Sequence, residues 1–252
     1  MQQIISVVNQ KGGVGKTTSS VNISSILGSK GYRTLLIDLD PQSNATSGLG
    51  LYANNFSYSI YHALMNLIDV NKAIYPTGVE NLFILPATRE LAGAEIELVN
   101  EVARETFLKD TLSKLQNQFE YIIIDCPPSL GLLTINALTA SDYTLIPVQS
   151  EYYALEGLAS LTSTINMVKK RLNPQLKIKG IIVTMFDSRN SLSKQVEQEA
   201  RNHFKDKVYT TIIPRNVKLS EAPSFGEPII IYDKKSKGSK AYKNLVKEMI
   251  YG

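Results

Sequence analysis

Short apolar runs alternate along this chain with longer segments that have helical periodicity. Residues 3–9 form a β-branched run that ends before a glycine-rich stretch, and residues 17–29 follow as a segment compatible with a helix. The next apolar run, 34–37, stops at Asp38 and Asp40, and a proline then ends regular structure. The chain therefore opens with a strand, a loop, a helix and a second strand whose carboxyl end carries acidic side chains.

Five further apolar runs have the length and composition of buried strands, and segments of helical length separate most of them. These runs cover residues 82–85, 121–124, 143–148, 178–183 and 208–213. Alternating strands and helices predict an α/β fold with a largely parallel, twisted sheet and helices on both faces. In the middle region, residues 58–67 and 91–102 are helix candidates, but the pattern leaves the topology of 51–104 open. Because no repeat or Gly/Ser linker divides the sequence, we expect a single domain over 1–252.

Composition limits the classes of function. Hydrophobic residues make up 43% of the chain and charged residues 20%, which is typical of a soluble globular protein. The single cysteine, Cys126, excludes an intramolecular disulfide and a metal or iron–sulfur site built from several cysteines. The sequence has neither an export leader nor a run of about 20 apolar residues. We therefore expect a cytoplasmic protein without a membrane span.

The net charge of +4 is unevenly distributed. Residues 187–252 contain 13 Lys/Arg against 8 Asp/Glu, whereas residues 1–186 contain 14 against 15. This asymmetry favours contact with a polyanion in the C-terminal quarter, and a solvated basic face is the alternative.

The most specific motif lies between the first predicted strand and the first predicted helix. It reads Gln10-Lys11-Gly12-Gly13-Val14-Gly15-Lys16-Thr17-Thr18. Glycines let the backbone N–H groups approach phosphates, and the helix N-terminus adds partial positive charge. We predict that Lys16 reaches the β- and γ-phosphates, that the Thr17 hydroxyl binds Mg²⁺, and that Thr18 bonds near the α-phosphate. A purely structural left-handed turn would need neither the lysine nor the hydroxyl.

Acidic residues end two of the predicted strands. Asp38 and Asp40 alternate, so both leave an extended strand on the same side, and a turn or helix cap is the alternative role for such a pair. Asp125 ends the run 121–124, which is the physical form of a Walker-B element whose carboxylate holds Mg²⁺ through water. The neighbouring Cys126 is expected to be a small buried residue and not a nucleophile, because no catalytic partner adjoins it.

The loop from Lys11 to Thr18 resembles the deviant Walker-A motif of the ParA/MinD ATPases, which are P-loop NTPases. The other matching strings are residues 38–42, 125–129, 151–157 and 214–226. The strings 151–157 and 218–226 are more similar to the Soj-type partition ATPases than to the cell-division branch. The resemblance implies a Mg²⁺-dependent ATPase with weak basal turnover. It also implies that Lys11 reaches across a nucleotide-sandwich dimer to the partner's phosphates, as a cation supplied in trans.

The same resemblance implies roles for the remaining candidate residues. Asp40 positions the attacking water, and Asp38 supports the Mg²⁺ shell. The triplet Pro214-Arg215-Asn216 flanks the adenine and favours ATP over GTP, with an ordinary proline turn as the alternative. The catalytic set is then Lys11, Lys16 and Asp40, and the magnesium set is Thr17, Asp38 and Asp125.

In the Soj branch, basic residues near the dimer face bind DNA without reading its sequence, which implies this role for Arg189, Lys194, Arg215 and Lys218. The resemblance implies an ATP-bound homodimer that coats nucleoid DNA. A ParB-type centromere-binding partner then stimulates hydrolysis through its N-terminal segment, and the released monomers dissociate. Regulation of replication initiation is a further role that the resemblance raises. A chromosomal or a plasmid origin of the gene stays open.

The principal alternative is a membrane-surface ATPase that resembles MinD. The C-terminal segment has a helical apolar stripe made of Tyr242, Leu245, Val246, Met249 and Ile250. Such stripes usually dock on their own domain, and this one has neither Trp nor Phe, so we expect docking and no membrane contact. A DNA-binding regulator without turnover is disfavoured because Asp40 is present.

Overall fold

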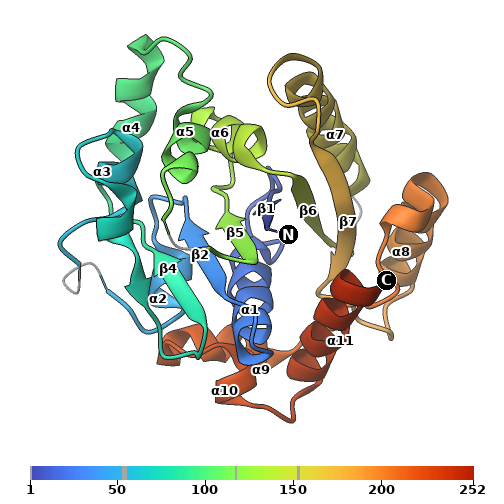
Figure 1. Cartoon of the computed structure of the whole chain (residues 1–252). Helices are drawn as coiled ribbons and strands as arrows, with labels where there is room; N and C mark the ends of the chain where they lie inside the picture. Colours follow the sequence, from blue (N-terminus) through green and yellow to red (C-terminus); the bar gives the residue numbers. More distant parts are fainter. Residues whose placement is uncertain (1, 53–55, 117, 152–153) are drawn as a thin grey trace.

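A seven-stranded sheet forms the centre of the computed structural model, which describes residues 2–52, 56–116, 118–151 and 154–252 (Figure 1). The strands, in chain order, are β1 (Gln3–Val7), β2 (Thr34–Asp38), β3 (Tyr75–Pro76), β4 (Leu82–Leu85), β5 (Tyr121–Asp125), β6 (Tyr143–Gln149) and β7 (Lys177–Thr184). Across the sheet their order is β3-β4-β2-β5-β1-β6-β7. Every neighbouring pair is parallel except β3 with β4. The prediction of a largely parallel sheet is confirmed.

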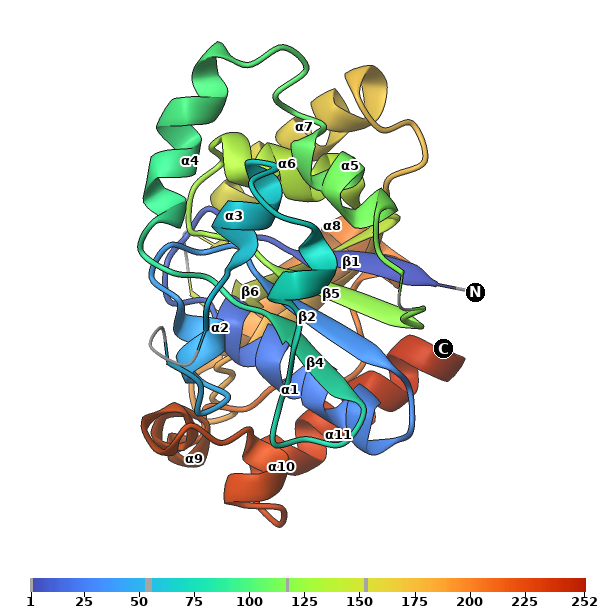
Figure 2. The same cartoon turned by 60° about the vertical axis from the view of Figure 1, so that its left-hand side comes forward.

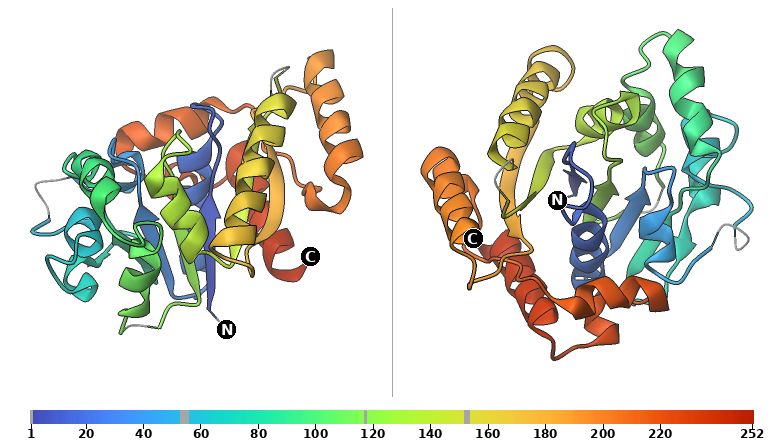
Figure 3. Two further views of the ribbon diagram at one scale, coloured as in Figure 1. Left: turned by 90° about the horizontal axis from the view of Figure 1, so that it is seen from above. Right: turned by 180° about the vertical axis from the view of Figure 1, so that it is seen from behind.

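Helices cover both faces of this sheet (Figure 1, Figure 3). In chain order they are α1 (Lys16–Ser29), α2 (Asn44–Ser47), α3 (Ile60–Leu64), α4 (Leu91–Glu97), α5 (Phe107–Ser113), α6 (Leu132–Ala140), α7 (Ala154–Arg171), α8 (Ser191–Phe204), α9 (Val217–Glu221), α10 (Ile229–Tyr232) and α11 (Lys237–Tyr251). Short 3-10 turns add η2 (Val70–Ala73), η3 (Leu98–Asn100), η4 (Lys205–Lys207) and η5 (Ala222–Phe225).

Alternate strand residues divide the core into two apolar layers. Leu35 and Ile37 of β2 pack with residues of α3 to α8, whereas Leu36 between them packs with residues of α1, α2 and α9 to α11. Successive side chains of a strand point to opposite faces, so a strand buried on both faces is a continuous apolar run. This is why the short runs of the sequence predicted the central strands correctly.

The carboxyl ends of the central strands meet at one edge of the sheet. Asp38, at the end of β2, is the register partner of Asp125, at the end of β5. Val7, at the end of β1, is also paired with Asp125, and the phosphate loop follows directly after this strand. Loops that follow parallel strands lie at the same edge, so the glycine-rich loop and both acidic segments come together there.

The predicted strand at 208–213 is wrong, because this segment forms only isolated bridges beside β7, at Val208 and Pro214. The backbone N–H groups of Thr210 and Thr211 donate to the Glu248 carboxylate of α11 at 2.7 and 2.9 Å. These two N–H groups therefore do not donate to a neighbouring strand of the sheet. The Glu248 carboxylate that accepts these hydrogen bonds lies almost forty positions away, so the local apolar pattern does not indicate this contact.

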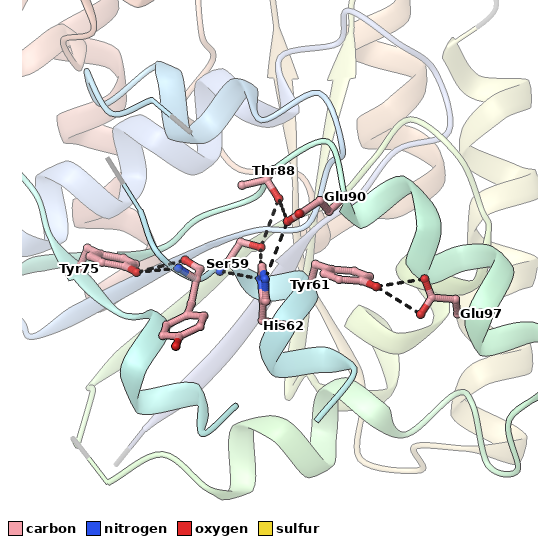
Figure 4. Close-up of polar contacts among 8 residues, drawn as sticks. Ser59, Tyr61, His62, Tyr75, Thr88, Glu90 and Glu97 are labelled. Carbon is pink, nitrogen blue, oxygen red and sulfur yellow. Dashed lines mark hydrogen bonds and ion pairs between the residues drawn. The ribbon is translucent and has the colours of Figure 1, made fainter. Parts of the chain in front are cut away.

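The middle region, whose topology the sequence left open, forms the antiparallel edge strand β3 and the short helices α3 and α4 (Figure 2). Both predicted helices are present but shorter than expected. Before α3, the Ser59 backbone N–H and hydroxyl lie 3.3 and 3.2 Å from His62 Nδ1 (Figure 4). The Tyr61 hydroxyl donates to Glu97 of α4 at 3.1 Å, which joins the two helices.

The C-terminal helix α11 docks on the sheet beside α1. Tyr242, Leu245 and Val246 are almost fully buried, and the Tyr242 hydroxyl lies 3.0 Å from Ser19 Oγ in α1. The expectation that the apolar stripe docks on its own domain is confirmed. Within the described residues, no helix has the length and hydropathy that crossing a bilayer would require.

Candidate functional site

The loop between β1 and α1 has the backbone of a phosphate-binding loop. Gly13 and Gly15 have φ values of 74° and 88°, in the left-handed region that favours glycine. Gly15 stands directly before the first turn of α1, whose N–H groups have no partner within the helix. Thr184, at the end of β7, donates its hydroxyl to the Val14 carbonyl at 2.8 Å and fixes the loop from the other side. The sequence motif did not predict this support from Thr184.

Lys16 lies inside the loop and is only 6% exposed. Its Nζ donates to the Lys11 carbonyl oxygen at 3.2 Å, so the side chain folds back over the loop. Burial lowers the pKa of Lys16, although the nearby Asp125 opposes this shift. A buried ammonium group with one carbonyl partner is suited to bind an incoming anion.

Thr17 and Asp125 meet as the sequence predicted. The Thr17 hydroxyl donates to one Asp125 carboxylate oxygen at 2.7 Å, and Ser20 donates to the other at 2.8 Å. Burial, and then the charge of Asp38, raise the pKa of Asp125 to about 7. Hydroxyl and carboxylate oxygens are the hard ligands that Mg²⁺ prefers, so this pair fits a magnesium site. Ser20, one helical turn after Lys16, was missed because it lies outside the motif.

Asp38 and Asp40 have different surroundings. Asp38 is fully buried, and its carboxylate accepts hydrogen bonds from the Thr46 N–H, the Thr46 hydroxyl and the Asp40 N–H at 2.8, 2.7 and 3.2 Å. Burial raises the pKa of Asp38 to about 6 in spite of these bonds. Asp40 lines the cavity above the loop and accepts from the Gln42 N–H at 2.9 Å. Asp38 therefore anchors the following segment, while Asp40 faces the cavity.

Lys11 pairs with Glu151, outside the phosphate loop. Its Nζ lies 2.7 Å from Glu151 Oε2, and both side chains are about half exposed. Gln149 donates to the other Glu151 oxygen at 2.6 Å. Tyr152 and Tyr153 of the string 151–157 lie outside the described residues. The sequence motif did not indicate a partner for Lys11 within its own chain.

Two adjoining cavities lie along the carboxyl edge of the sheet. One has a volume of about 440 Å³ and is lined by the phosphate loop, Asp40 and residues of α2 and η5. The other, of about 540 Å³, is lined by Pro214, Arg215 and Asn216. Gly15, Thr18, Met185, Leu219 and Pro223 line both. The predicted phosphate and base ends therefore form one continuous groove.

Asn216 carries an unsatisfied acceptor at the base end of this groove. Its Oδ1 atom is buried and has no hydrogen-bond partner. A buried amide oxygen without a partner costs free energy, on the order of 1–3 kcal/mol, that a ligand donor would recover. This is a second observation, independent of the sequence motif, that points to a ligand there.

The predicted basic residues lie on three separate segments. Arg189 is highly exposed and pairs with Asp187 at 2.8 Å, which holds the pKa of that carboxyl down at about 2. Arg215 also lowers the pKa of Asp187, so the two arginines flank one carboxylate. Lys194 is exposed on α8. Lys218, on α9, pairs with Glu221 at 2.8 Å. The acidic partners of these cations were not expected from the sequence.

Cys126 is buried beside Asp125, and burial raises the pKa of its thiol well above the usual value. This agrees with its prediction as a small buried neighbour. In the part of the chain that the structure describes, no group of three His, Cys, Asp or Glu side chains is arranged to hold a metal ion. A magnesium ion at Thr17 and Asp125 would thus take its remaining ligands from phosphate and water.

Comparison with known proteins shows the family to which the chain is similar. Residues 2–178 match the family described as an AAA domain. The sporulation initiation inhibitor protein Soj of Bacillus subtilis (strain 168) is 56% identical over 99% of this chain and 98% of its own length. The chromosome partitioning protein ParA of Myxococcus xanthus (strain DK1622) is 55% identical over 98% of this chain and 88% of its own.

A solved structure covers the whole length as well. It is cobyrinic acid a,c-diamide synthase from Mycobacterium smegmatis with bound ADP and magnesium, which is 37% identical, has a TM-score of 0.86 and matches 98% of this chain and 93% of its own. The same synthase with a bound ATP analog and magnesium also has a TM-score of 0.86.

The sheet, the glycine-rich loop at the start of α1 and the acidic strand ends define a P-loop nucleoside triphosphatase. Sequence identity to the partitioning relatives is well above that to the synthase. The chain belongs to the ParA/Soj family of chromosome-partitioning ATPases.

Proposed function

We propose that this chain hydrolyses ATP with Mg²⁺ and acts in DNA partition as a homodimer that ATP assembles. The separation of the two loop lysines carries the proposal. Lys16 is buried and lines the cavity, whereas the Lys11 side chain is 40% exposed and is not among the described residues that line it. A loop that uses one lysine for its own nucleotide has a second cation left for the phosphates of another copy.

The phosphates occupy the 440 Å³ cavity, where the loop N–H groups and Lys16 bind them. The Thr17 hydroxyl, which donates to Asp125 in this structure, and the Asp125 carboxylate would hold the magnesium ion. When bound, Mg²⁺ neutralises charge on the phosphate oxygens. The ADP, ATP analog and magnesium in the M. smegmatis synthase, which shares this fold, support this ligand set.

Adenine is the base that best fits the other end of the groove. The buried Asn216 Oδ1 needs a donor, and adenine presents its exocyclic amine where guanine presents a carbonyl oxygen. Pro214 and Arg215 form the surrounding wall. Asp40, whose carboxylate faces the cavity, positions the attacking water.

Two copies close face to face over their nucleotides, and Lys11 of each leaves Glu151 to bind the other's phosphates. In this closed state Arg189, Lys194, Arg215 and Lys218 bind double-stranded DNA through its phosphates. A ParB-type partner stimulates hydrolysis, and the chain works at the nucleoid as a single ATPase domain over residues 1–252. Identity of 55–56% with the partitioning relatives supports this cycle.

The test is release of phosphate from ATP by the purified full chain, with and without Mg²⁺. We expect slow, Mg²⁺-dependent release that GTP does not support. Lys16→Ala should abolish nucleotide binding, while Lys30→Ala, at the far end of α1, should leave it intact. Retained tight ATP binding by Lys16→Ala would overturn the proposed nucleotide site.

A further inference from the structure

Two glycines from distant parts of the chain are packed backbone against backbone. A Cβ atom added to Gly226 would lie 2.4 Å from the Gly50 Cα, and one added to Gly50 would lie 3.0 Å from the Gly226 carbonyl oxygen. Both residues also have positive φ, 73° and 65°. Since no side chain fits between them, this glycine contact (Gly50 with Gly226) brings its two segments closer than other residues would allow.

Both segments line the proposed nucleotide cavity. Gly50 closes the turn after α2 and donates its N–H to the Ser47 carbonyl at 2.9 Å, and Ser47 lines the cavity. Gly226 follows η5 and donates to the Pro223 carbonyl at 3.0 Å, and Pro223 lines both cavities. Figure 2 shows α2 and α9 on the same side of the molecule. The glycine contact joins the segments that follow them.

The wall on the α2 side is also tied to the acidic residues. Thr46 of α2 is held by the Asp38 carboxylate through two hydrogen bonds. The segment between Asp40 and Gly50 is therefore fixed at one end by Asp38 and at the other by Gly226. A change at the glycine contact would shift the cavity wall and the segment that follows Asp40 together.

We propose that Gly50 and Gly226 are positioning residues for the nucleotide. Their contact sets the separation between the α2 wall and the η5 wall, and with it the fit of the cleft around its ligand. This inference rests on the proposed nucleotide site and adds to it residues outside every motif that binds phosphate or metal. Misplacement of reacting groups by about 1 Å, even through a distant mutation, lowers the rate of an enzyme by as much as about 100-fold.

Gly31 provides a matched control. It also has positive φ, 93°, but a Cβ added there would meet nothing within 4 Å. It follows α1 at the end of the helix remote from the phosphate loop. Gly31→Ala therefore reproduces the backbone strain of an alanine in the left-handed region without the clash.

The experiment measures the affinity of a fluorescent N-methylanthraniloyl-ADP for the full chain with Mg²⁺, well below the Tm of each variant. We expect Gly226→Ala to weaken binding about tenfold or more and Gly50→Ala to weaken it a few-fold. Gly31→Ala should stay within about twofold of the wild type, even where its Tm falls. If Gly226→Ala does not fold, Gly50→Ala still tests the proposal, because its added Cβ makes the milder clash.

The outcomes separate the two proposals. A wild-type chain that does not bind the probe overturns the nucleotide site itself. A wild-type chain that binds, together with Gly50→Ala binding as Gly31→Ala does, overturns the positioning role of the glycine contact. If all three variants have a lower Tm but an unchanged affinity for the probe, Gly50 and Gly226 act only as turn residues.

Discussion

Lys11 Nζ lies 2.7 Å from Glu151 Oε2, which joins the phosphate loop to the segment after β6. The cation that we propose for the partner's phosphates is thus held by a carboxylate of its own chain. To act in trans, Lys11 must exchange this carboxylate for the partner's phosphates. The ion pair therefore opposes dimer formation by the small free energy of an exposed pair.

Glu151→Gln removes that competition. We expect the ATP-analogue-bound variant to dimerise at about two- to thirtyfold lower concentration, since two exposed ion pairs break per dimer and each contributes roughly 0.2–1 kcal/mol. Sedimentation equilibrium measures the constant. Glu197→Gln, which breaks the partly buried i,i+4 pair with Arg201 on α8, is the control and should leave it unchanged. A weaker dimer in Glu151→Gln would mean that Glu151 supports the closed state.

Asp40→Ala should separate binding from turnover. Its carboxylate lines the cavity, and loss of the group that positions water lowers the rate about 100-fold or more. Nucleotide affinity should change little, so the dimer and its hold on DNA should persist. Single-turnover hydrolysis measures the rate, with Asp110→Ala on the exposed side of α5 as the control. Hydrolysis at the wild-type rate would remove Asp40 from catalysis.

Asp125 makes the free chain sensitive to pH. Its pKa is about 7 in the folded chain and about 4 in an unfolded one, so the folded state binds the proton more tightly. The contribution of Asp125 to the free energy of unfolding is therefore fully present below pH 4 and is lost as the pH rises through 7. Asp38, with a pKa raised to about 6, acts in the same direction.

Asp125→Asn should therefore stabilise the chain at pH 8 in the absence of nucleotide and Mg²⁺. We expect a net gain of about 1 kcal/mol in the free energy of unfolding, or about 2–4 °C in Tm. The gain is no larger because the amide keeps only one acceptor oxygen for the Thr17 and Ser20 hydroxyls. Thermal scans from pH 5 to pH 8 measure it. Asp187→Asn, where the pKa is lowered to about 2, should give no gain. If the Tm of Asp125→Asn depends on pH as strongly as that of the wild type, Asp125 is not the source of the pH dependence.

Arg189→Glu should weaken DNA binding about tenfold at low salt, because it replaces a cation at the proposed surface by an anion. The slope of affinity against salt should also become shallower. Fluorescence anisotropy with a random duplex and an ATP analogue measures both. Arg171→Glu, at the end of α7, makes the same charge change elsewhere and should have little effect. Equal losses in the two variants would indicate only an effect of net charge.

The sequence predicted the central sheet well, and it placed the glycine-rich loop and the acidic strand ends at one edge of it. Continuous apolar runs predict buried parallel strands, and the loop from Lys11 to Thr18 depends on local backbone geometry, with positive φ at Gly13 and Gly15. The contact between Thr17 and Asp125 followed because parallel strands end at one edge. These features are encoded within a few neighbouring residues.

The features that the sequence did not predict depend on contacts between distant residues. Glu248 accepts the Thr210 and Thr211 N–H groups, Glu151 pairs with Lys11, and Thr46 donates to the Asp38 carboxylate. The packing of Gly50 on Gly226 is of the same kind. No sequence period or motif links the two partners of any of these contacts, since each contact forms only when the fold brings them together.

The most direct test of the account is the mass of the full chain in solution with ADP and with a slowly hydrolysed ATP analogue, each with and without duplex DNA. We predict a monomer with ADP, a dimer with the analogue and Mg²⁺, and DNA binding by the dimer alone. A mass and a DNA affinity that are the same with both nucleotides would contradict it.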